Sequence, residues 1–294
     1  MAGTMDILLT GGAGQVGTEL RAATWPAEVR LHAPDRTALD LADPASVAGM
    51  AASRAWSAII SSGAYTAVDK AESDVATAWA TNALAPAILS RAAAEAGIPI
   101  VHVSTDYVFP GSKAGPYHED DPIGPLGVYG ASKEGGEQAV RSANTRHAIV
   151  RTAWVVSAHR ANFVKTMLRL AADRDEVRVV ADQLGCPTVA ADLAVALRTI
   201  VLRMTEDPSA PAGTFHYVNA GETNWAAFAE AIFAASAARG GPTARVVPIT
   251  TAEYPTPARR PANSRLATDK VRAAYGVDTP DWRASLERIV AALV

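Results

Sequence analysis

A glycine-rich turn directly after the first apolar run is the feature that most constrains this chain. Residues 5–10, MDILLT, form a short apolar run of the kind that makes a buried parallel strand. Gly11, Gly14 and Gly17 follow at once, and a helical stretch then extends to about residue 23. Glycines so spaced permit a tight bend, close approach of the backbone to a pyrophosphate, and packing of helix on strand. The sequence therefore predicts a strand–turn–helix unit whose helix N-terminus holds a dinucleotide cofactor.

The rest of the first half repeats this alternation of apolar runs and helical stretches. The apolar runs are residues 29–33, 58–64, 98–103 and 147–152, and the clearest helical stretch is 75–95, which Gly97 ends. Strands that alternate with helices favour an α/β fold of the Rossmann type, in which a doubly wound parallel sheet carries helices on both faces. The carboxyl ends of its strands are expected to form the ligand crevice.

The second half is less regular and predicts a smaller mixed α/β domain. We expect helices near 161–172, 192–204, 225–238 and 280–293, and strands near 176–180, 214–218 and 245–249. On this pattern the nucleotide-binding domain comprises residues 1–153 together with about 189–218. The smaller domain comprises residues 154–188 and 219–294.

Composition excludes several classes of protein. Hydrophobic residues make up 49% of the 294 and charged residues 19%, which excludes disorder as the main state. The net charge of −3 gives no reason to expect a nucleic acid or a membrane as partner. The single cysteine, Cys186, excludes a disulfide framework, and no acidic cluster predicts a metal site. Residues 1–6 show no signal-peptide pattern and no apolar run reaches membrane-spanning length, so we expect a cytoplasmic protein.

Charged residues after the second apolar run leave the choice of nicotinamide cofactor open. In this fold an acidic residue at that place binds the ribose hydroxyls, whereas an arginine accommodates the 2′-phosphate of NADPH. Here Asp35 and Arg36 are adjacent, so both interpretations stand. Asp40 lies near the adenine or is a solvated turn carboxylate. Asp43 is expected to cap the next helix, with Pro44 as its first residue.

Polar residues follow the run at 98–103, namely Ser104, Thr105 and Asp106. Because they lie at the carboxyl end of a predicted parallel strand, we expect hydroxyls and a carboxylate in the ligand crevice. Asn82, within the long helix, is expected to be an exposed side chain, and a hydrogen bond across a neighbouring strand end is the alternative.

Tyr129 and Lys133 are four residues apart near the start of a helix, so their side chains share one helical face. An ammonium close to a phenol favours the phenolate and lowers a pKa that is about 10 in water. Such a phenol exchanges a proton with a carbonyl or alcohol oxygen near neutral pH. A surface Tyr and Lys on an ordinary helix is the alternative, which a cofactor turn and a hydroxyl in the same crevice make weaker.

Together these motifs resemble those of the extended short-chain dehydrogenase/reductases. The glycine turn, the hydroxyl after the fourth strand and the Tyr-x-x-x-Lys pair belong to that whole superfamily. More specific runs are similar to the family of dTDP-4-dehydrorhamnose reductases, and the likeness extends over almost the whole chain. These runs are AYTAVDKAE at 64–72, STDYVF at 104–109, RTAW at 151–154 and PARRP at 257–261.

The resemblance implies reduction of the C4 ketone of a dTDP-linked 4-keto-6-deoxyhexose, dTDP-4-dehydro-L-rhamnose, with NADPH as hydride donor and NADH as the alternative. Tyr129 would donate the proton, Lys133 would lower its pKa and hold the nicotinamide ribose, and Thr105 would hydrogen-bond the ketone oxygen. The expected cofactor-binding residues are Gly11, Gly14, Gln15, Val16, Gly17, Asp35, Arg36, Asp40, Leu41, Gly63, Ala64, Tyr65, Tyr129 and Lys133. The expected substrate-binding residues are Val68, Ser104, Thr105, Asp106, Tyr107 and Trp154 in the pocket for the sugar, together with Arg259 and Arg260. The two arginines are our addition, because a guanidinium matches the oxygens of a diphosphate, and a surface pair is the alternative.

Three departures from the family pattern bear on the site. Ser61–Ala64 stands where the family carries Asn-Ala-Ala, Val156 replaces a Tyr, and the glycine that usually follows it is absent. We therefore expect the segment 157–160 to shape the pocket rim differently, which affects the exact sugar and not the chemistry. A ketoreductase for another nucleotide-linked 4-keto-6-deoxysugar stays open for that reason. A non-catalytic, cofactor-binding regulatory subunit also stays open, although such a protein would need none of the catalytic residues. The sequence does not decide between a monomer and a homodimer.

Overall fold

A six-stranded parallel sheet forms the centre of the computed structural model, which describes residues 4–294. Its strand order is β10-β5-β4-β3-β1-β2, and every neighbouring pair is parallel. The strands are β1 (Met5–Thr10), β2 (Val29–His32), β3 (Ala58–Ser61), β4 (Ile100–Thr105), β5 (His147–Thr152) and β10 (Gly213–His216). The predicted doubly wound α/β fold is confirmed. Residues 1–3, on which the expectation of no signal peptide partly depends, lie outside the described residues.

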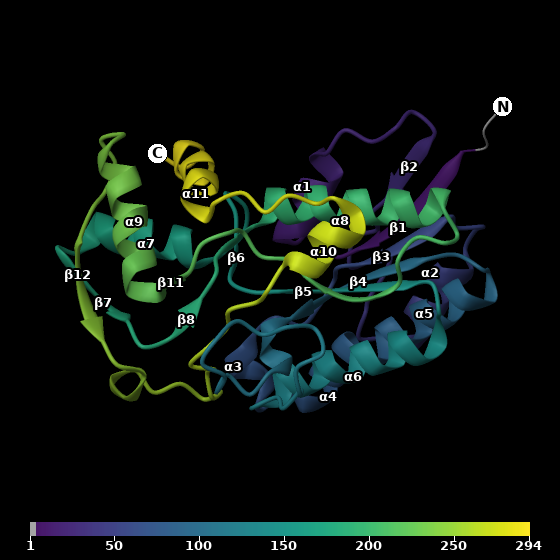
Figure 1. The fold of residues 1–294 in the computed structure, drawn as a ribbon, viewed down its shortest axis with the longest axis horizontal. Helices are drawn as coiled ribbons and strands as arrows, with labels where there is room; N and C mark the ends of the chain where they lie inside the picture. The colour runs from purple at the N-terminus through teal and green to yellow at the C-terminus, as the bar shows by residue number, and fades with distance from the viewer. Residues whose placement is uncertain (1–3) are drawn as a thin grey trace.

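Helices cover both faces of this sheet (Figure 1). On one face lie α1 (Gln15–Ala22), α8 (Ala190–Glu206) and α10 (Asp269–Tyr275). On the other face lie α2 (Pro44–Ala52), α3 (Val68–Ala71), α4 (Val75–Trp79), α5 (Ala85–Glu95) and α6 (Val128–Ala143). None of the helices within residues 4–294 combines the length and the apolar character that crossing a membrane requires.

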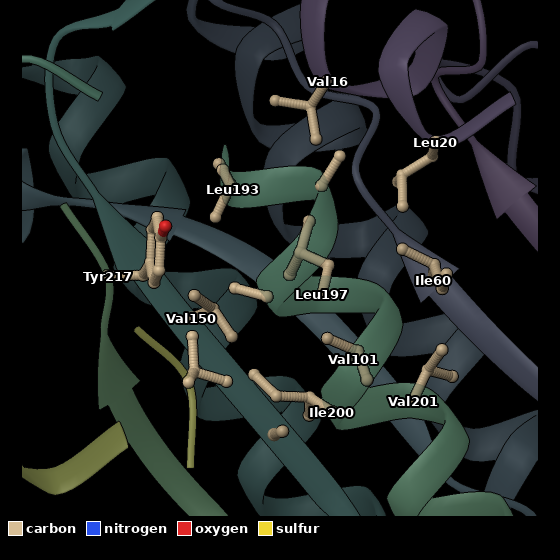
Figure 2. Packing of buried hydrophobic residues seen from close by; sticks show 14 of the residues in the cluster. Val16, Leu20, Ile60, Val101, Val150, Leu193, Leu197, Ile200, Val201 and Tyr217 are labelled. Atoms are coloured by element: carbon tan, nitrogen blue, oxygen red, sulfur yellow. The ribbon is translucent and has the colours of Figure 1, made fainter. Parts of the chain in front are cut away.

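Two hydrophobic cores follow from the alternation of side chains along the strands. Ile7 and Leu9 of β1 belong to the core beneath α1 and α8, whereas Leu8 belongs to the core beneath α2 and α5. Figure 2 shows the first core, where Leu197 of α8 lies among side chains such as Val101 of β4. These strands are apolar on both faces because helices bury both.

Local signals in the first half position its helices as predicted. Asp43 caps α2 by accepting a hydrogen bond from the backbone N–H of Ala45, with Pro44 in the first turn. The long predicted helix is continuous but contains a π-helical turn, η1 (Ala80–Leu84), between α4 and α5. Gly97 follows α5 with φ +68°, a left-handed conformation that glycine adopts without strain.

A smaller group of elements lies at one end of the main sheet (Figure 1). It has its own core, to which Val164, Phe228 and Leu286 contribute. Its helices are α7 (Phe163–Asp173), α9 (Trp225–Ala237) and α11 (Trp282–Ala291), and its main strands are β7 (Glu176–Val180) and β12 (Arg245–Ile249), which pair in parallel. All five were predicted to within a few residues.

Several short elements were not predicted. They are α3, η2 (Asp106–Val108), β6 (Val155–Val156), β8 (Leu184–Gly185), β9 (Thr188–Val189), β11 (Thr223–Asn224), η3 (Thr251–Glu253) and α10. Strands of two residues are too short to show a periodic pattern. Val271 of α10 packs into the core of the main sheet, although the sequence assigns this stretch to the smaller domain.

The winding of the sheet leaves a crevice at the carboxyl ends of β1 and β3. The chain passes from β1 to β2 on one side and then to β3 on the other side of β1. Open α/β sheets bind ligands where the winding reverses in this way. The backbone is tight there, because a Cβ on Gly11 would collide with Gly63, the second residue after β3.

Candidate active site

A cavity of about 1090 Å³ extends along the carboxyl ends of β1, β3 and β4. It brings together all the residues that the sequence predicts for cofactor binding, namely Gly11, Gly14, Gln15, Val16, Gly17, Asp35, Arg36, Asp40, Leu41, Gly63, Ala64, Tyr65, Tyr129 and Lys133. Val68, Ser104, Thr105, Asp106, Tyr107 and Trp154 also line it. Arg259 and Arg260 do not: Arg259 is exposed, and Arg260 is paired with Asp69.

The turn after β1 has the geometry that a pyrophosphate site needs. Gly14 is the N-cap of α1 and gives it no side-chain hydrogen bond, so the first backbone N–H groups of the helix face the cavity without a capping side chain. A Cβ on Gly17 would collide with the carbonyl oxygen of Gly11. The residues present therefore fit a dinucleotide, with its phosphates at the N-terminus of α1.

At the end of the cavity beyond β2, the Asp35 side chain is hydrogen-bonded to its own turn, whereas the Arg36 side chain is largely exposed. Asp35 Oδ1 accepts hydrogen bonds from Thr37 N at 2.9 Å, Thr37 Oγ1 at 2.6 Å and Ala38 N at 3.1 Å. These bonds hold the pKa of the Asp35 carboxyl below its ordinary value and commit it to its own turn. The Arg36 side chain is 82% exposed, with Asp40 3.8 Å away. Arg36 is thus the group at this end that is available to a 2′-phosphate.

Tyr129 and Lys133 lie on α6 with the predicted spacing, but their electrostatics differ from the expectation. Lys133 Nζ donates to the carbonyl oxygen of Val103 on β4 at 2.6 Å, and burial lowers its pKa to about 8. Loss of water contact raises the pKa of Tyr129, while a hydrogen bond with Thr105 acts in the opposite direction. The expected lowering by Lys133 is absent because its ammonium is directed to the strand. The phenol therefore stays protonated at neutral pH, the state that a proton donor requires.

Asn82 connects the cofactor side of the cavity to the catalytic helix. Its side chain is fully buried: Oδ1 accepts from Tyr65 N at 2.8 Å, and Nδ2 donates to Tyr65 O at 3.1 Å and to Ser132 Oγ at 3.0 Å. The expectation of an exposed Asn was wrong, and the alternative of a bond across a strand end is correct. Asn82 lies in the π-helical turn, a feature frequent at functional sites. The loop around Tyr65 and the close packing of α6, where a Cβ on Gly136 would meet Asn82 O, together bury it.

The end of the cavity around Thr105 and Trp154, where the sequence places the sugar and which we call the sugar end, carries a buried carboxylate. Asp106 is 3% exposed, and its Oδ1 accepts from Thr105 Oγ1 at 3.0 Å. Its Oδ2 makes no hydrogen bond of normal geometry within residues 4–294. Burial raises the pKa of the carboxyl to about 6, while the hydroxyls of Ser264 and Thr105 act in the opposite direction. An acceptor held in this way suits a hydroxyl of a polar ligand. No group of His, Cys, Asp and Glu side chains in the described part of the chain is placed to hold a metal ion.

Aromatic side chains and one ion pair complete this end. The Tyr107 ring lies edge-on to Tyr129 with 5.4 Å between centroids. Arg260 donates to Asp69 Oδ2 at 2.6 Å and, at 3.4 Å, to Tyr107 Oη, so it supports the wall of the cavity from behind. Trp154, with φ +49°, stacks on Trp225 at 3.6 Å between centroids.

The segment of residues 157–160, which we expected to shape the pocket rim, follows β6 and lies against the glycine-rich turn. Ser157 Oγ and Asn162 Nδ2 donate to Gln15 Oε1 at 2.9 and 3.0 Å, and Arg160 Nε donates to Ala13 O at 2.6 Å. Arg160 and Asn162 line the cavity. The sequence placed Arg160 only in the segment expected at the pocket rim and gave neither residue a binding role. Asn162 also caps α7, the one signal that marked it as an ordered residue.

Comparison with known proteins gives consistent matches over nearly the full length. The chain is 48% identical to a dTDP-4-dehydrorhamnose reductase of Sinorhizobium fredii over 291 residues, which cover 99% of this chain and 98% of that protein. The reductase of Escherichia coli K12 is 39% identical, covering 97% of each chain. The crystal structure of a Bacillus anthracis dTDP-4-dehydrorhamnose reductase in complex with NADP aligns with a TM-score of 0.90 at 34% identity, covering 98% of this chain and 99% of that one. The model of the RmlD substrate binding domain family matches residues 5–294, and the chain belongs to this family.

Proposed function

We propose that this protein reduces the C4 ketone of dTDP-4-dehydro-L-rhamnose to give dTDP-L-rhamnose, with NADPH as the reductant. The observation that carries the proposal is the meeting of Thr105, Tyr129 and Lys133 in one cavity with the glycine-rich turn. Relatives that bear the name dTDP-4-dehydrorhamnose reductase match the chain almost end to end, and one was crystallised with NADP. A non-catalytic regulatory subunit would have no need of that set of catalytic side chains.

The cofactor would lie along the cavity from Arg36 to Lys133. The backbone N–H groups at the start of α1 hold the pyrophosphate, and Arg36 holds the 2′-phosphate that distinguishes NADPH from NADH. Lys133 and Tyr129 face the nicotinamide end. When bound, the cofactor supplies a hydride to the C4 carbon.

Tyr129 donates the proton that the carbonyl oxygen needs once C4 is reduced. Its raised pKa keeps the phenol protonated at neutral pH, so the proton is present before the reaction begins. Thr105 Oγ1, now directed to Asp106, turns toward the ketone oxygen and orients it. Lys133, with a pKa of about 8, is mostly charged at neutral pH. It stabilises the phenolate that the transfer leaves behind once its ammonium turns from Val103 O toward Tyr129.

The sugar is bound by side chains around the reacting oxygen. The unpartnered Oδ2 of Asp106 accepts a hydrogen bond from a sugar hydroxyl. Trp154, whose ring is stacked on Trp225 and packed against Gly185, contributes an edge to the wall of the sugar site. Val68, Ser104 and Tyr107 complete the wall. Arg260 acts on the diphosphate only if it leaves Asp69, and we propose no role for Arg259.

Two further assignments accompany this function. We propose a nucleotide-binding domain of residues 1–153 with about 189–218, and a nucleotide-sugar domain of 154–188 with 219–294. The separate core of α7, α9 and α11 supports the division, except that α10, with Val271 in the core of the main sheet, belongs with the first domain. We also propose that the protein works in the cytoplasm, because a free buried cysteine and a dinucleotide cofactor suit a reducing compartment.

The test is turnover with a defined set of sugars. Purified protein with NADPH is mixed with dTDP-4-dehydro-L-rhamnose or with other nucleotide-linked 4-keto-6-deoxysugars, and the products are identified. We expect cofactor oxidation and dTDP-L-rhamnose with the first substrate, and slower reaction with NADH. Faster turnover of another sugar would replace the substrate, and no oxidation with any sugar would overturn the reductase.

A further inference from the structure

Arg160 adopts a backbone conformation that an arginine does not favour. Its φ is +57°, and apart from Trp154 no other non-glycine residue within 4–294 has a positive φ. Glycine is the residue that accepts this region without strain, and strained residues persist where the surroundings hold them in place. An arginine at such a position indicates a functional role for its side chain.

Hydrogen bonds hold Arg160 against the glycine-rich turn. Its Nε donates to the carbonyl oxygen of Ala13 at 2.6 Å. On either side of it in the chain, Ser157 and Asn162 both donate to Gln15 Oε1. The segment that carries Arg160 is therefore fixed to the first residues of α1, although it is about 147 residues away in the sequence.

The guanidinium has donors left for a ligand. Arginine carries five N–H donors, and only the Nε–H of Arg160 has a hydrogen-bond partner within the described residues. The side chain is exposed and lines the cavity. Ala13 directly precedes Gly14, the N-cap of α1, so the remaining donors lie beside the place where backbone N–H groups await a pyrophosphate.

The other basic residues along the cavity are engaged elsewhere. Lys133 is bound to Val103 O, Lys70 lies 3.9 Å from Asp74, and Arg36 stands at the end beyond β2. Arg160 alone among them hydrogen-bonds to the glycine-rich turn.

We propose that Arg160 is a clamp on the cofactor pyrophosphate, which its terminal guanidinium nitrogens bind beside the N-terminus of α1. A guanidinium matches two phosphate oxygens at once, so the clamp adds charge-assisted bonds to those of the backbone. The inference rests on the proposed function for the presence of a dinucleotide, and it adds a residue from the smaller lobe to the phosphate site. Because the pyrophosphate is common to NADPH and NADH, the clamp does not distinguish them.

The experiment measures dissociation constants of NADPH and NADH for the full chain by quenching of its tryptophan fluorescence. For Arg160→Ala and Arg160→Gly we expect binding of both dinucleotides to weaken by about tenfold and by equal factors. Arg160→Lys keeps the charge but not the paired donors, so its loss should be smaller. Arg36→Ala is the matched control, and it should weaken NADPH alone.

A thermal unfolding curve of each variant separates binding from folding. Arg160→Gly relieves the strained φ, so its melting temperature should equal or exceed that of the unsubstituted protein while its binding is weaker. Unchanged binding in Arg160→Ala and Arg160→Gly would overturn the clamp, and a loss confined to NADPH would move the contact to the 2′-phosphate and overturn it too. If the unsubstituted protein binds neither dinucleotide, the proposed function fails as well; if it binds both and the variants equal it, the clamp alone fails.

Discussion

The two ends of the cavity are built in different ways. At the cofactor end, the turn of residues 11–17 follows β1 directly, and its shape is set by glycines that touch one another. At the sugar end, Asp69 meets Arg260 across 191 residues of sequence, and Trp154 meets Trp225 in a stack. Backbone recognition of phosphates is thus encoded locally, whereas side-chain recognition of the sugar depends on long-range packing. Substitutions at the sugar end are therefore able to change the sugar that is bound, while the reaction catalysed between the two ends stays the same.

The chemistry between the two ends gives the largest expected effect. Tyr129→Phe removes the proton donor and keeps the ring, so kcat should fall by about 10²–10⁴-fold while NADPH binding stays unchanged. Tyr254→Phe is the matched control, since Tyr254 is exposed and does not line the cavity. Steady-state kinetics and cofactor titration measure both. Full activity in Tyr129→Phe would remove this residue from the mechanism.

The local character of the cofactor end is tested by glycine replacement. Gly17→Ala introduces a methyl group against Gly11 O, so we expect NADPH binding to be lost and the free energy of unfolding to fall by about 1–3 kcal/mol. Gly49→Ala, in α2 with open space around it, should instead raise stability by about 0.5–1 kcal/mol. Urea unfolding measures the stability of both variants, and cofactor titration measures their binding of NADPH. Tight NADPH binding by Gly17→Ala would show that the turn is not shaped by close contact.

The buried carboxylate at the sugar end is expected to cost stability. Asp106 has a folded-state pKa of about 6 against an ordinary value of 3.8, so the folded protein holds the proton more tightly and loses stability as pH rises from 4 through 6. Asp106→Asn removes that cost, which is about 3 kcal/mol at pH 7, and weakens sugar binding. Denaturant unfolding at pH 7 and at pH 4 tests this. An equal gain at both pH values would mean that ionisation is not the cause.

The long-range ion pair gives the smallest effect. Asp69→Asn breaks the pair with Arg260; both side chains are partly exposed, so we expect about 1 kcal/mol or less, seen as a rise of up to about fivefold in KM for the nucleotide sugar. NADPH binding should not change. Glu95→Gln, which breaks an exposed pair on α5, is the control with no effect on either. A change in NADPH binding would mean that the two ends are not independent.

The same contrast explains what the sequence predicted. The strands His147–Thr152, Glu176–Val180 and Arg245–Ile249 and the turn at residues 11–17 were found because local periodicity and glycine spacing encode them. The burial of Asn82 was missed because it depends on the approach of α6. The contact of Arg160 with Ala13 was missed because nothing in the sequence shows which loop covers the turn.

The hydrogen-bond partner of Lys133 is also a feature that depends on long-range packing. Its spacing from Tyr129 is local, and α6 reproduces it. The partner of its ammonium is Val103 O on β4, which only the packing of helix on sheet supplies. A motif therefore predicts which side chains share a face, and the fold decides which atoms they bind.

The central claim is that the two ends of the cavity bring a hydride and a C4 ketone together. The most direct test is a reaction with dTDP-4-dehydro-L-rhamnose and NADPH that carries deuterium in the transferred position of the nicotinamide, followed by mass spectrometry and NMR of the product. We predict dTDP-L-rhamnose with one deuterium, located at C4. A product without deuterium at C4, or a mixture in which the sugar is unchanged, would contradict the account.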